Sequence, residues 1–189
     1  MMQNYPSVEQ LAEMTRLLTQ ARIENWLMEG LGSWRWWVLA VLLIVPWAIW
    51  AKLLDKKKLL ELALFGMFIM VDSITLDELG FELCLWNYPV DVLPVFPRLS
   101  SVDYTVVPIV FMLAYQYFSN WKSFFWALVT VSAVFSFVCE PFIAKLGFYV
   151  LIKWWYPYSF VIYIIMGLVS RWLVKVFADI TRKHNENSN

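Results

Sequence analysis

Long apolar stretches without charged residues alternate with short polar segments from residue 34 onward. A helix needs ~20 mostly apolar residues to cross the hydrocarbon core of a bilayer, and a chain in hydrocarbon must satisfy its own backbone hydrogen bonds. Four charge-free stretches, and a fifth that carries Asp72, therefore predict an all-α membrane protein with five transmembrane helices. With flanking residues, the predicted bundle spans 34–177 and its helices cover 34–54, 59–86, 102–120, 121–140 and 157–177.

Residues 1–33 show a different pattern, because charged side chains are spread among the apolar ones. This spread is unlike the basic start and apolar core of a signal peptide. Ser7 and Gln10 have the spacing of a helix-capping box. We expect an amphipathic helix on the membrane surface, with a mobile polar leader as the alternative, and a polar cytoplasmic tail over 178–189 whose last residues are disordered. The side chains that approximate the apolar face of the predicted surface helix are Leu11, Met14, Leu18, Ala21 and Leu31.

Composition narrows the functional classes. Of the 189 residues, 61% are hydrophobic and 16% are charged, whereas an ordinary globular domain is about 25% charged. The net charge of zero gives no bulk attraction to nucleic acid, which we therefore exclude as a partner. A single histidine, His184, and two isolated cysteines exclude a histidine-built metal site and a CxxC redox pair. Nucleotide-binding and hydrolase motifs are absent, so no metal or cofactor is expected.

Lysine and arginine predict the orientation in the membrane. With the C-terminus inside, nine basic residues lie on the cytoplasmic side and six on the outer side, and the dense Lys56–Lys58 cluster is cytoplasmic. Cytoplasmic loops are enriched in Lys and Arg, so the N-terminus is predicted outside. Aromatic residues mark the predicted outer boundary, as interfacial anchors do: Trp34, Trp36, Trp37, Trp86, Tyr88, Trp154, Trp155, Tyr156 and Tyr158.

Two stretches of the chain resemble each other. Leu79–Phe81 and Leu146–Phe148 both read LGF, and a W-x-Y-P sequence follows each, at Trp86–Pro89 and Trp154–Pro157. The similarity predicts that helices 2–3 and 4–5 are two hairpins of the same polarity, related by a pseudo-twofold axis along the membrane normal. The alternative is coincidence, since Leu, Phe, Trp and Tyr are abundant here and the alignment needs a gap.

Carboxyl groups concentrate in the half of the spans that we place outside. Ionisable residues inside membrane helices usually face the bundle interior and mark function. Polar residues at helical spacing on helices 2 to 5 suggest that these faces converge on an acid-lined cavity that opens outward. The alternative is that the small polar residues line helix contacts, while the acids pair with Arg98, Lys145 or Lys153. The predicted ligand-binding residues are Asp72, Glu140, Asp103, Glu82, Tyr104, Tyr115 and Tyr163.

Asp72 is the sharpest candidate, because its own helix has no basic residue near it. A pair formed by Asp72 and Glu140 in a low-dielectric site would not ionise twice and would share a proton. Such a pair serves as a proton donor, as a counter-ion for a cationic ligand or as a proton-coupled binding site, and the sequence leaves these roles open. Cys84 and Cys139 lie near the outer ends of helices 2 and 4, where free thiols are favoured over a disulfide.

One set of residues carries a resemblance to a known family: Trp34–Trp37, Pro46, Asp72, Leu79–Phe81, Trp86–Pro89, Asp103, Pro108, Tyr115, Gln116, Glu140 and Pro141. Over roughly residues 25 to 175, the chain resembles a family of small, uncharacterised multi-pass membrane proteins of spore-forming Gram-positive bacteria. The resemblance implies a location in the bacterial plasma membrane. It implies no particular activity, because the family has no assigned one. A looser likeness is to sterol-isomerase-like five-helix proteins and bacterial lycopene cyclase domains. The sterol isomerases use an intramembrane histidine that this chain lacks, so no catalytic residue is carried over.

Three functions from different classes remain open at this point. The first is a binding or permeation unit for a small amphiphile or cation, with Asp72 and Glu140 as its charged anchor. The second is a membrane-embedded lipid or isoprenoid isomerase or cyclase that uses the same acids as general acid and base. The third is a scaffold subunit of a homo- or hetero-oligomer, which works through the surface helix and Lys56–Lys58. In each case membrane lipids are partners.

Overall fold

The computed structural model describes residues 5–95 and 101–187 and confirms an all-α architecture. Three π-helical turns cover Trp26–Gly30, Val102–Val106 and Phe135–Cys139, and a 3-10 turn covers Lys56–Lys58. Two short strands, β1 (Trp86–Asn87) and β2 (Val150–Leu151), pair antiparallel. The helices are α1 (Val8–Asn25), α2 (Trp34–Leu53), α3 (Leu59–Glu82), α4 (Val107–Tyr117), α5 (Trp121–Val134), α6 (Glu140–Lys145) and α7 (Tyr156–Asn187).

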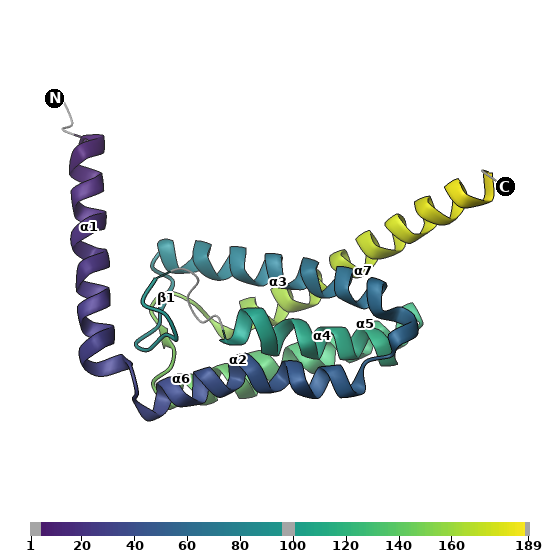
Figure 1. The fold of residues 1–189 in the computed structure, drawn as a ribbon, viewed down its shortest axis with the longest axis horizontal. Coiled ribbons are helices and arrows are strands. Elements are labelled where there is room, and N and C mark those ends of the chain that lie inside the picture. The colour runs from purple at the N-terminus through teal and green to yellow at the C-terminus, as the bar shows by residue number, and fades with distance from the viewer. Residues whose placement is uncertain (1–4, 96–100, 188–189) are drawn as a thin grey trace.

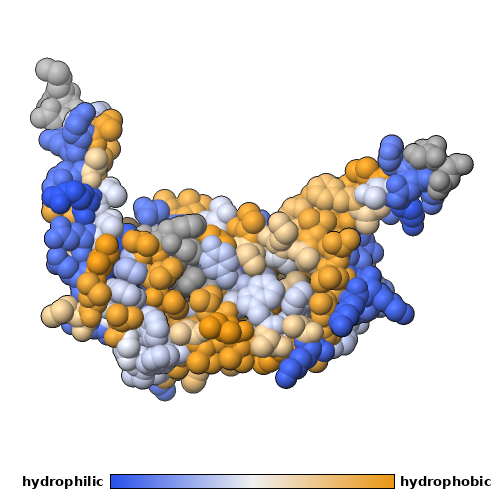
Figure 2. Space-filling view, in the orientation of Figure 1, coloured by the Kyte–Doolittle hydropathy of each residue, from blue (hydrophilic) through white to orange (hydrophobic). Residues whose placement is uncertain are grey.

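Four of the described helical stretches are long and apolar enough to cross a membrane, which makes this a multi-pass membrane protein. They run over Trp34–Leu53, Lys56–Glu82, Trp121–Lys145 and Tyr156–Glu186. Figure 1 shows them lying alongside one another, with α4 between them and α1 standing across one end. Figure 2 shows hydrophobic side chains over much of the bundle and hydrophilic ones along α1 and at the opposite end.

The third predicted span, 102–120, is a short helix in the structure. Its helical part covers Val102–Val106 and Val107–Tyr117, which at ~1.5 Å per residue is only about 24 Å. It ends early because Phe118 leaves the helical conformation, with φ −110° and ψ 80°. Asn120 then caps the next helix by accepting a hydrogen bond from the Ser123 N–H at 2.7 Å.

Other helix boundaries differ from the sequence-based prediction at the C-terminal side. The fourth span continues past 140 to Lys145. The last helix starts at Tyr156 and runs to Asn187, so the last residues of the tail, which we expected to be disordered, are helical as far as the structure describes them. An ion pair between Arg182 and Asp179, with 3.0 Å between nitrogen and oxygen, adds a typical i,i+3 helix contact there. At the N-terminus the predicted capping box of Ser7 and Gln10 is confirmed.

Two of the π turns end two residues before a proline. Val102–Val106 precedes Pro108, and Phe135–Cys139 precedes Pro141. Proline has no N–H to donate, and in an α-helix its ring clashes with the carbonyl four residues earlier. The wider π turn carries one extra residue, which moves that carbonyl out of the way. The helices can therefore pass through both prolines.

The core of the bundle lies between α3, α4, α5 and α7. Its fully buried side chains include Leu62, Phe65, Phe111, Phe124 and Leu128. In α2, by contrast, the only residue classed as buried is Leu39, so this helix lies at the periphery and exposes apolar side chains on the outside. Such an outward-facing apolar surface is what a helix in contact with lipid requires.

Arg171 on α7 is the most unusual residue of the packed interior, because only 2% of it is exposed. Its Nη1 donates to the Phe118 carbonyl at 2.8 Å and its Nη2 donates to the Ser119 carbonyl. The guanidinium also lies 4.2 Å from the ring centre of Phe124 and 5.1 Å from that of Tyr115. Arg171 therefore satisfies two carbonyls of the turn that follows α4, close to the helix C-terminus that a cation favours.

The helices α3 and α6 end with the same hydrogen-bond pattern. The Leu85 N–H donates to the Gly80 carbonyl and the Phe148 N–H donates to the Ile143 carbonyl, at 2.9 and 3.0 Å. In this motif the residue after the cap adopts a left-handed conformation. That residue is Cys84 (φ 54°) in one case and Gly147 (φ 77°) in the other. The two LGF sequences thus lie at different positions relative to their helix ends, and the internal repeat stays a prediction.

This motif leads to a prediction on stability. Cys84→Gly is expected to raise the free energy of unfolding by about 1 kcal/mol, because a left-handed conformation strains any residue with a Cβ. Gly147→Ala is expected to lower it by at least as much, since the new Cβ would also lie 2.9 Å from an Arg35 guanidinium nitrogen. Thermal unfolding of both variants in detergent measures the two shifts. Equal unfolding midpoints for the variants and the parent would contradict the assignment of a left-handed helix-end residue to Cys84 and Gly147.

Candidate functional site

A cavity of about 290 Å³ lies among α3, the start of α4, α6 and the start of α7, next to the segments that carry β1 and β2. Its walls are mostly apolar, and they include three carboxyl groups, Asp77, Asp103 and Glu140. No lysine, arginine or histidine of the described chain lines it. The other polar or aromatic side chains on its walls are Ser73, Trp86, Tyr88, Phe135, Cys139, Phe142, Tyr149, Trp154, Ser159 and Tyr163.

The local helix geometry explains why the carboxyls face one space. Asp77 follows Ser73 by four residues on α3, so both side chains lie on the same helix face. Asp103 lies inside one π turn, and Glu140 directly follows another. Because a π turn inserts a residue, it changes the direction in which the neighbouring side chains point. Turns of this kind recur at functional sites.

Asp77 is held by two donors from the segment around β1. The Tyr88 hydroxyl and the Trp86 indole N–H, the latter at 3.2 Å, both donate to its Oδ1. Its Oδ2 is buried and has no hydrogen-bond partner among the described residues. One oxygen of the carboxyl is therefore fixed by protein donors, while the other has no donor in the described chain.

The two carboxyl oxygens of Asp103 also differ in their hydrogen bonding. The Ser73 hydroxyl donates to its Oδ1 at 2.6 Å, whereas its Oδ2 is buried without a partner in the described chain. Only 5% of Asp103 is exposed. Ser73, which donates to Asp103, lies one helical turn before Asp77 on α3, and both carboxyls line the cavity.

Glu140 belongs to a hydrogen-bonded chain on the α7 side of the cavity. The Trp154 indole N–H donates to the Ser159 hydroxyl at 2.9 Å, and this hydroxyl donates to Glu140 Oε2 at 3.0 Å. The Tyr163 side chain also interacts with the Glu140 carboxyl and, electrostatically, with Asp103. Tyr163 therefore lines the cavity beside Glu140.

Aromatic rings close the cavity on the side of the two strands. Tyr88 and Tyr149 stack with 5.6 Å between ring centres, and Trp86 meets Trp154 edge to face at 5.0 Å. Burial raises the pKa of both the Tyr88 and the Tyr149 hydroxyl above the usual value. Both hydroxyls thus remain protonated near neutral pH, and Tyr88 keeps its role as a donor to Asp77. A ring wall beside carboxylates is the environment in which cations bind well.

The structure brings three of the seven predicted ligand-binding residues to the cavity, namely Asp103, Glu140 and Tyr163. Asp72 does not line it: its carboxyl is partly exposed and accepts a hydrogen bond from Ser170 at 3.4 Å. Asp72 and Glu140 therefore have different partners. Asp72 precedes Asp77 by five residues, which places it about 140° away around α3.

The other three predicted residues lie elsewhere. Glu82 is exposed at the end of α3, and Tyr104 is half-buried on the π turn outside the cavity wall. Tyr115 donates to Glu61 near Arg171, away from the cavity. Lys145 and Lys153, which were considered as partners for the acids, are exposed and do not line it. Arg98 lies outside the described residues.

Asp77 is the functional candidate that the sequence analysis did not select. Its signal was the Ser73–Asp77 spacing of one helical turn, together with the two donors in the Trp86–Pro89 sequence. No group of three or more His, Cys, Asp or Glu side chains in the described chain is arranged to hold a metal ion. Cys84 and Cys139 are free thiols. Comparison with protein-family models, curated proteins and solved structures finds no match.

Proposed function

We propose that this membrane protein binds a small cationic amphiphile in the cavity between Asp77, Asp103 and Glu140. The observation that carries the proposal is the pair of buried carboxyl oxygens, Asp77 Oδ2 and Asp103 Oδ2, that have no partner among the described residues. A buried polar atom without a hydrogen bond is costly, and a ligand with N–H donors would remove that cost. The rings of Trp86 and Tyr88 would cover the apolar part of the same ligand.

The volume of the cavity limits the size of this ligand. About 290 Å³ is near the lower end of ligand pockets and equals roughly ten water molecules at ~30 Å³ each. A short alkylammonium ion fits such a space, whereas a whole sterol or carotenoid is too large for it. A single ammonium group offers three donors, which is enough for the two free oxygens.

The wider setting of the cavity belongs to the same proposal. We place the protein in a bacterial plasma membrane with five crossings, the fifth being the short helix of Val102–Tyr117, and with the N-terminus outside. The cavity then opens toward the outer face, on the side away from the Lys56–Lys58 cluster. The exposed apolar surface of α2 supports the place in a bilayer, and the basic Lys56–Lys58 cluster supports the orientation.

Calorimetric titration of the protein in lipid nanodiscs with hexylammonium chloride tests the binding proposal. Asp103→Asn is expected to weaken binding about tenfold or more, since a hydrogen bond to a charged group contributes ~1.5–3 kcal/mol. Asp72→Asn is the matched control, because Asp72 lies outside the cavity wall, and it should bind like the parent. Uncharged hexanol should bind much more weakly. Equal affinities for hexanol and hexylammonium, or an unchanged Asp103→Asn, would refute the proposal.

A second candidate is a membrane-embedded lipid or isoprenoid isomerase or cyclase, favoured by the neighbouring carboxyls Asp77 and Asp103 within aromatic walls. In that case a carboxylic acid would protonate a double bond, and a second carboxylate would remove a proton from the resulting cation. Incubation with a ten-carbon isoprenoid such as geraniol, followed by mass spectrometry, separates the candidates. Rearranged products that disappear in Asp103→Asn would establish the enzyme.

A further inference from the structure

The helix α1 (Val8–Asn25) stands across the end of the bundle that carries β1, and none of its residues is buried. At ~1.5 Å per residue its 18 residues span about 27 Å. Its C-terminal half lies beside the segment of β1, while its N-terminal half projects past the end of α3 (Figure 1). The described chain places no protein on the bundle side of this projecting half.

The direction of α1 is fixed by contacts at its base. The Trp26 indole N–H donates to the Asp91 carbonyl at 3.0 Å, and the Arg22 guanidinium lies 5.1 Å from the ring centre of Phe81. Below them, Gly32 has a left-handed φ of 75°, and this conformation turns the chain into α2. The placement of α1 across the end of the bundle is therefore built into the fold.

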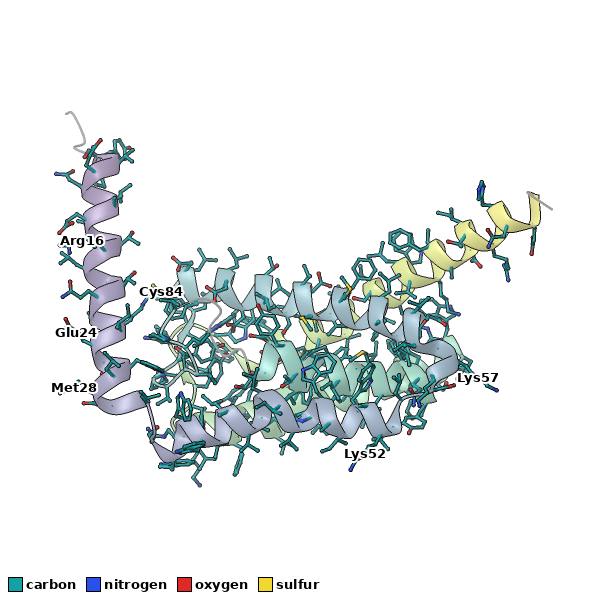
Figure 3. The ribbon with its side chains drawn as sticks, in the orientation of Figure 1. Arg16, Glu24, Met28, Lys52, Lys57 and Cys84 are labelled. Carbon is teal, nitrogen blue, oxygen red and sulfur yellow. The ribbon has the colours of Figure 1, made fainter. Side chains whose placement is uncertain are left out.

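The two faces of α1 differ in chemistry. Figure 3 shows that the side chains of Arg16 and Glu24 point away from the bundle. Leu11 and Leu18 are seven residues apart and therefore share a face, and they are 49% and 50% exposed. Glu13 lies about 200° from Leu11 at ~100° per residue, where it pairs with Arg16 at 2.7 Å. The apolar face is thus turned toward the side on which the bundle lies.

The four membrane-spanning helices determine what lies on that side. A bilayer that surrounds them must extend sideways from the bundle, under the projecting half of α1. We propose that α1 rests its Leu11–Leu18 face in the headgroup region of this bilayer, on a surface of zwitterionic lipid. The helix has three acids (Glu9, Glu13, Glu24) and two basic residues (Arg16, Arg22), so anionic headgroups would repel it slightly. Interfacial helices bury such a face at the boundary between headgroups and acyl chains.

Spin labels on the complete protein test this docking. In a Cys84→Ser, Cys139→Ser background, nitroxides are attached through Leu11→Cys and Leu18→Cys on the apolar face, and through Glu13→Cys and Gln20→Cys on the polar face. All four positions are exposed, so the labels do not disturb the core. After reconstitution into phosphatidylcholine vesicles, the collision rates of each label with oxygen and with a water-soluble nickel chelate are measured.

We expect the ratio of oxygen collisions to nickel-chelate collisions to be several-fold higher for labels at 11 and 18 than for labels at 13 and 20. Four labels that are equally accessible to nickel would overturn the proposal, because α1 would then stand in water. Labels at 11 and 18 that are shielded from both reagents would also overturn it, since the face would then be covered by protein. A contrast that appears only after addition of phosphatidylglycerol would refute the assignment to zwitterionic lipid.

Discussion

Arg171→Met is expected to lower the free energy of unfolding by about 2–4 kcal/mol. The change leaves the Phe118 and Ser119 carbonyls without their donor, and each unpaired carbonyl costs ~1–3 kcal/mol when it is away from water. It also removes the cation that lies over the Phe124 ring, a contact that contributes ~0.5–2 kcal/mol. Part of the loss is offset, because methionine has no charge to desolvate.

Equilibrium unfolding in mixed detergent micelles measures this effect. The matched control is Arg182→Met, which breaks an exposed ion pair with Asp179 on the same helix and should cost less than about 1 kcal/mol. Arg171→Lys should fall between the two, since one ammonium group does not reproduce the fork of the guanidinium. If Arg171→Met and Arg182→Met unfold at the same detergent ratio, the closing role of Arg171 at the end of α4 is wrong.

Gly80→Ala is the second change with a large expected effect, and it acts on stability and on the cavity together. A Cβ at this position would lie 2.0 Å from the Cη2 and Cζ2 atoms of Trp86. The indole cannot move easily, because it donates to Asp77 at 3.2 Å and meets Trp154 at 5.0 Å. Overpacking of this kind costs ~1–3 kcal/mol, only partly offset by the ~1 kcal/mol helix preference of alanine over glycine.

Near-ultraviolet circular dichroism and thermal unfolding report the two consequences. Displacement of the Trp86 ring should change the aromatic spectrum and weaken hexylammonium binding. Gly66→Ala is a suitable control: its Cβ would also meet a side chain, the Met112 sulfur at 2.5 Å, but methionine is flexible and can adapt. Identical spectra and binding for Gly80→Ala and the parent would show that the Trp86 contact does not hold the cavity wall.

The sequence was sufficient to predict where the helices lie along the chain. It was insufficient to predict which face of each helix points toward the cavity. The charge-free stretches predicted helices in the right places because hydrophobicity over ~20 residues depends on composition alone. The direction of one carboxyl depends on how neighbouring helices pack, and this is why Asp72 was preferred to Asp77. The sequence around Asp77 does not indicate that Tyr88 and Trp86 fold back and donate hydrogen bonds to its carboxyl.

The helix ends show a second limit of sequence reasoning. Matching LGF letters aligned Gly80 with Gly147, whereas the hydrogen bonds align Cys84 with Gly147. A residue other than glycine rarely adopts the left-handed conformation, so the sequence did not indicate that Cys84 would do so. The early end of α4 was missed for a related reason, since it depends on Arg171, 53 residues further along the chain.

The π turn Phe135–Cys139 divides its helix into two independently phased parts, α5 before it and α6 after it. The extra residue shifts the angular register by about 100°, so side chains before the turn follow a different helical count from those after it. Glu140 on α6 faces the cavity, while Phe124 and Leu128 on α5 face the core. Removal of one residue from Phe135–Cys139 would therefore rotate α6 while leaving the phase of α5 intact. Pocket chemistry and bundle packing can thus change separately within one continuous helix.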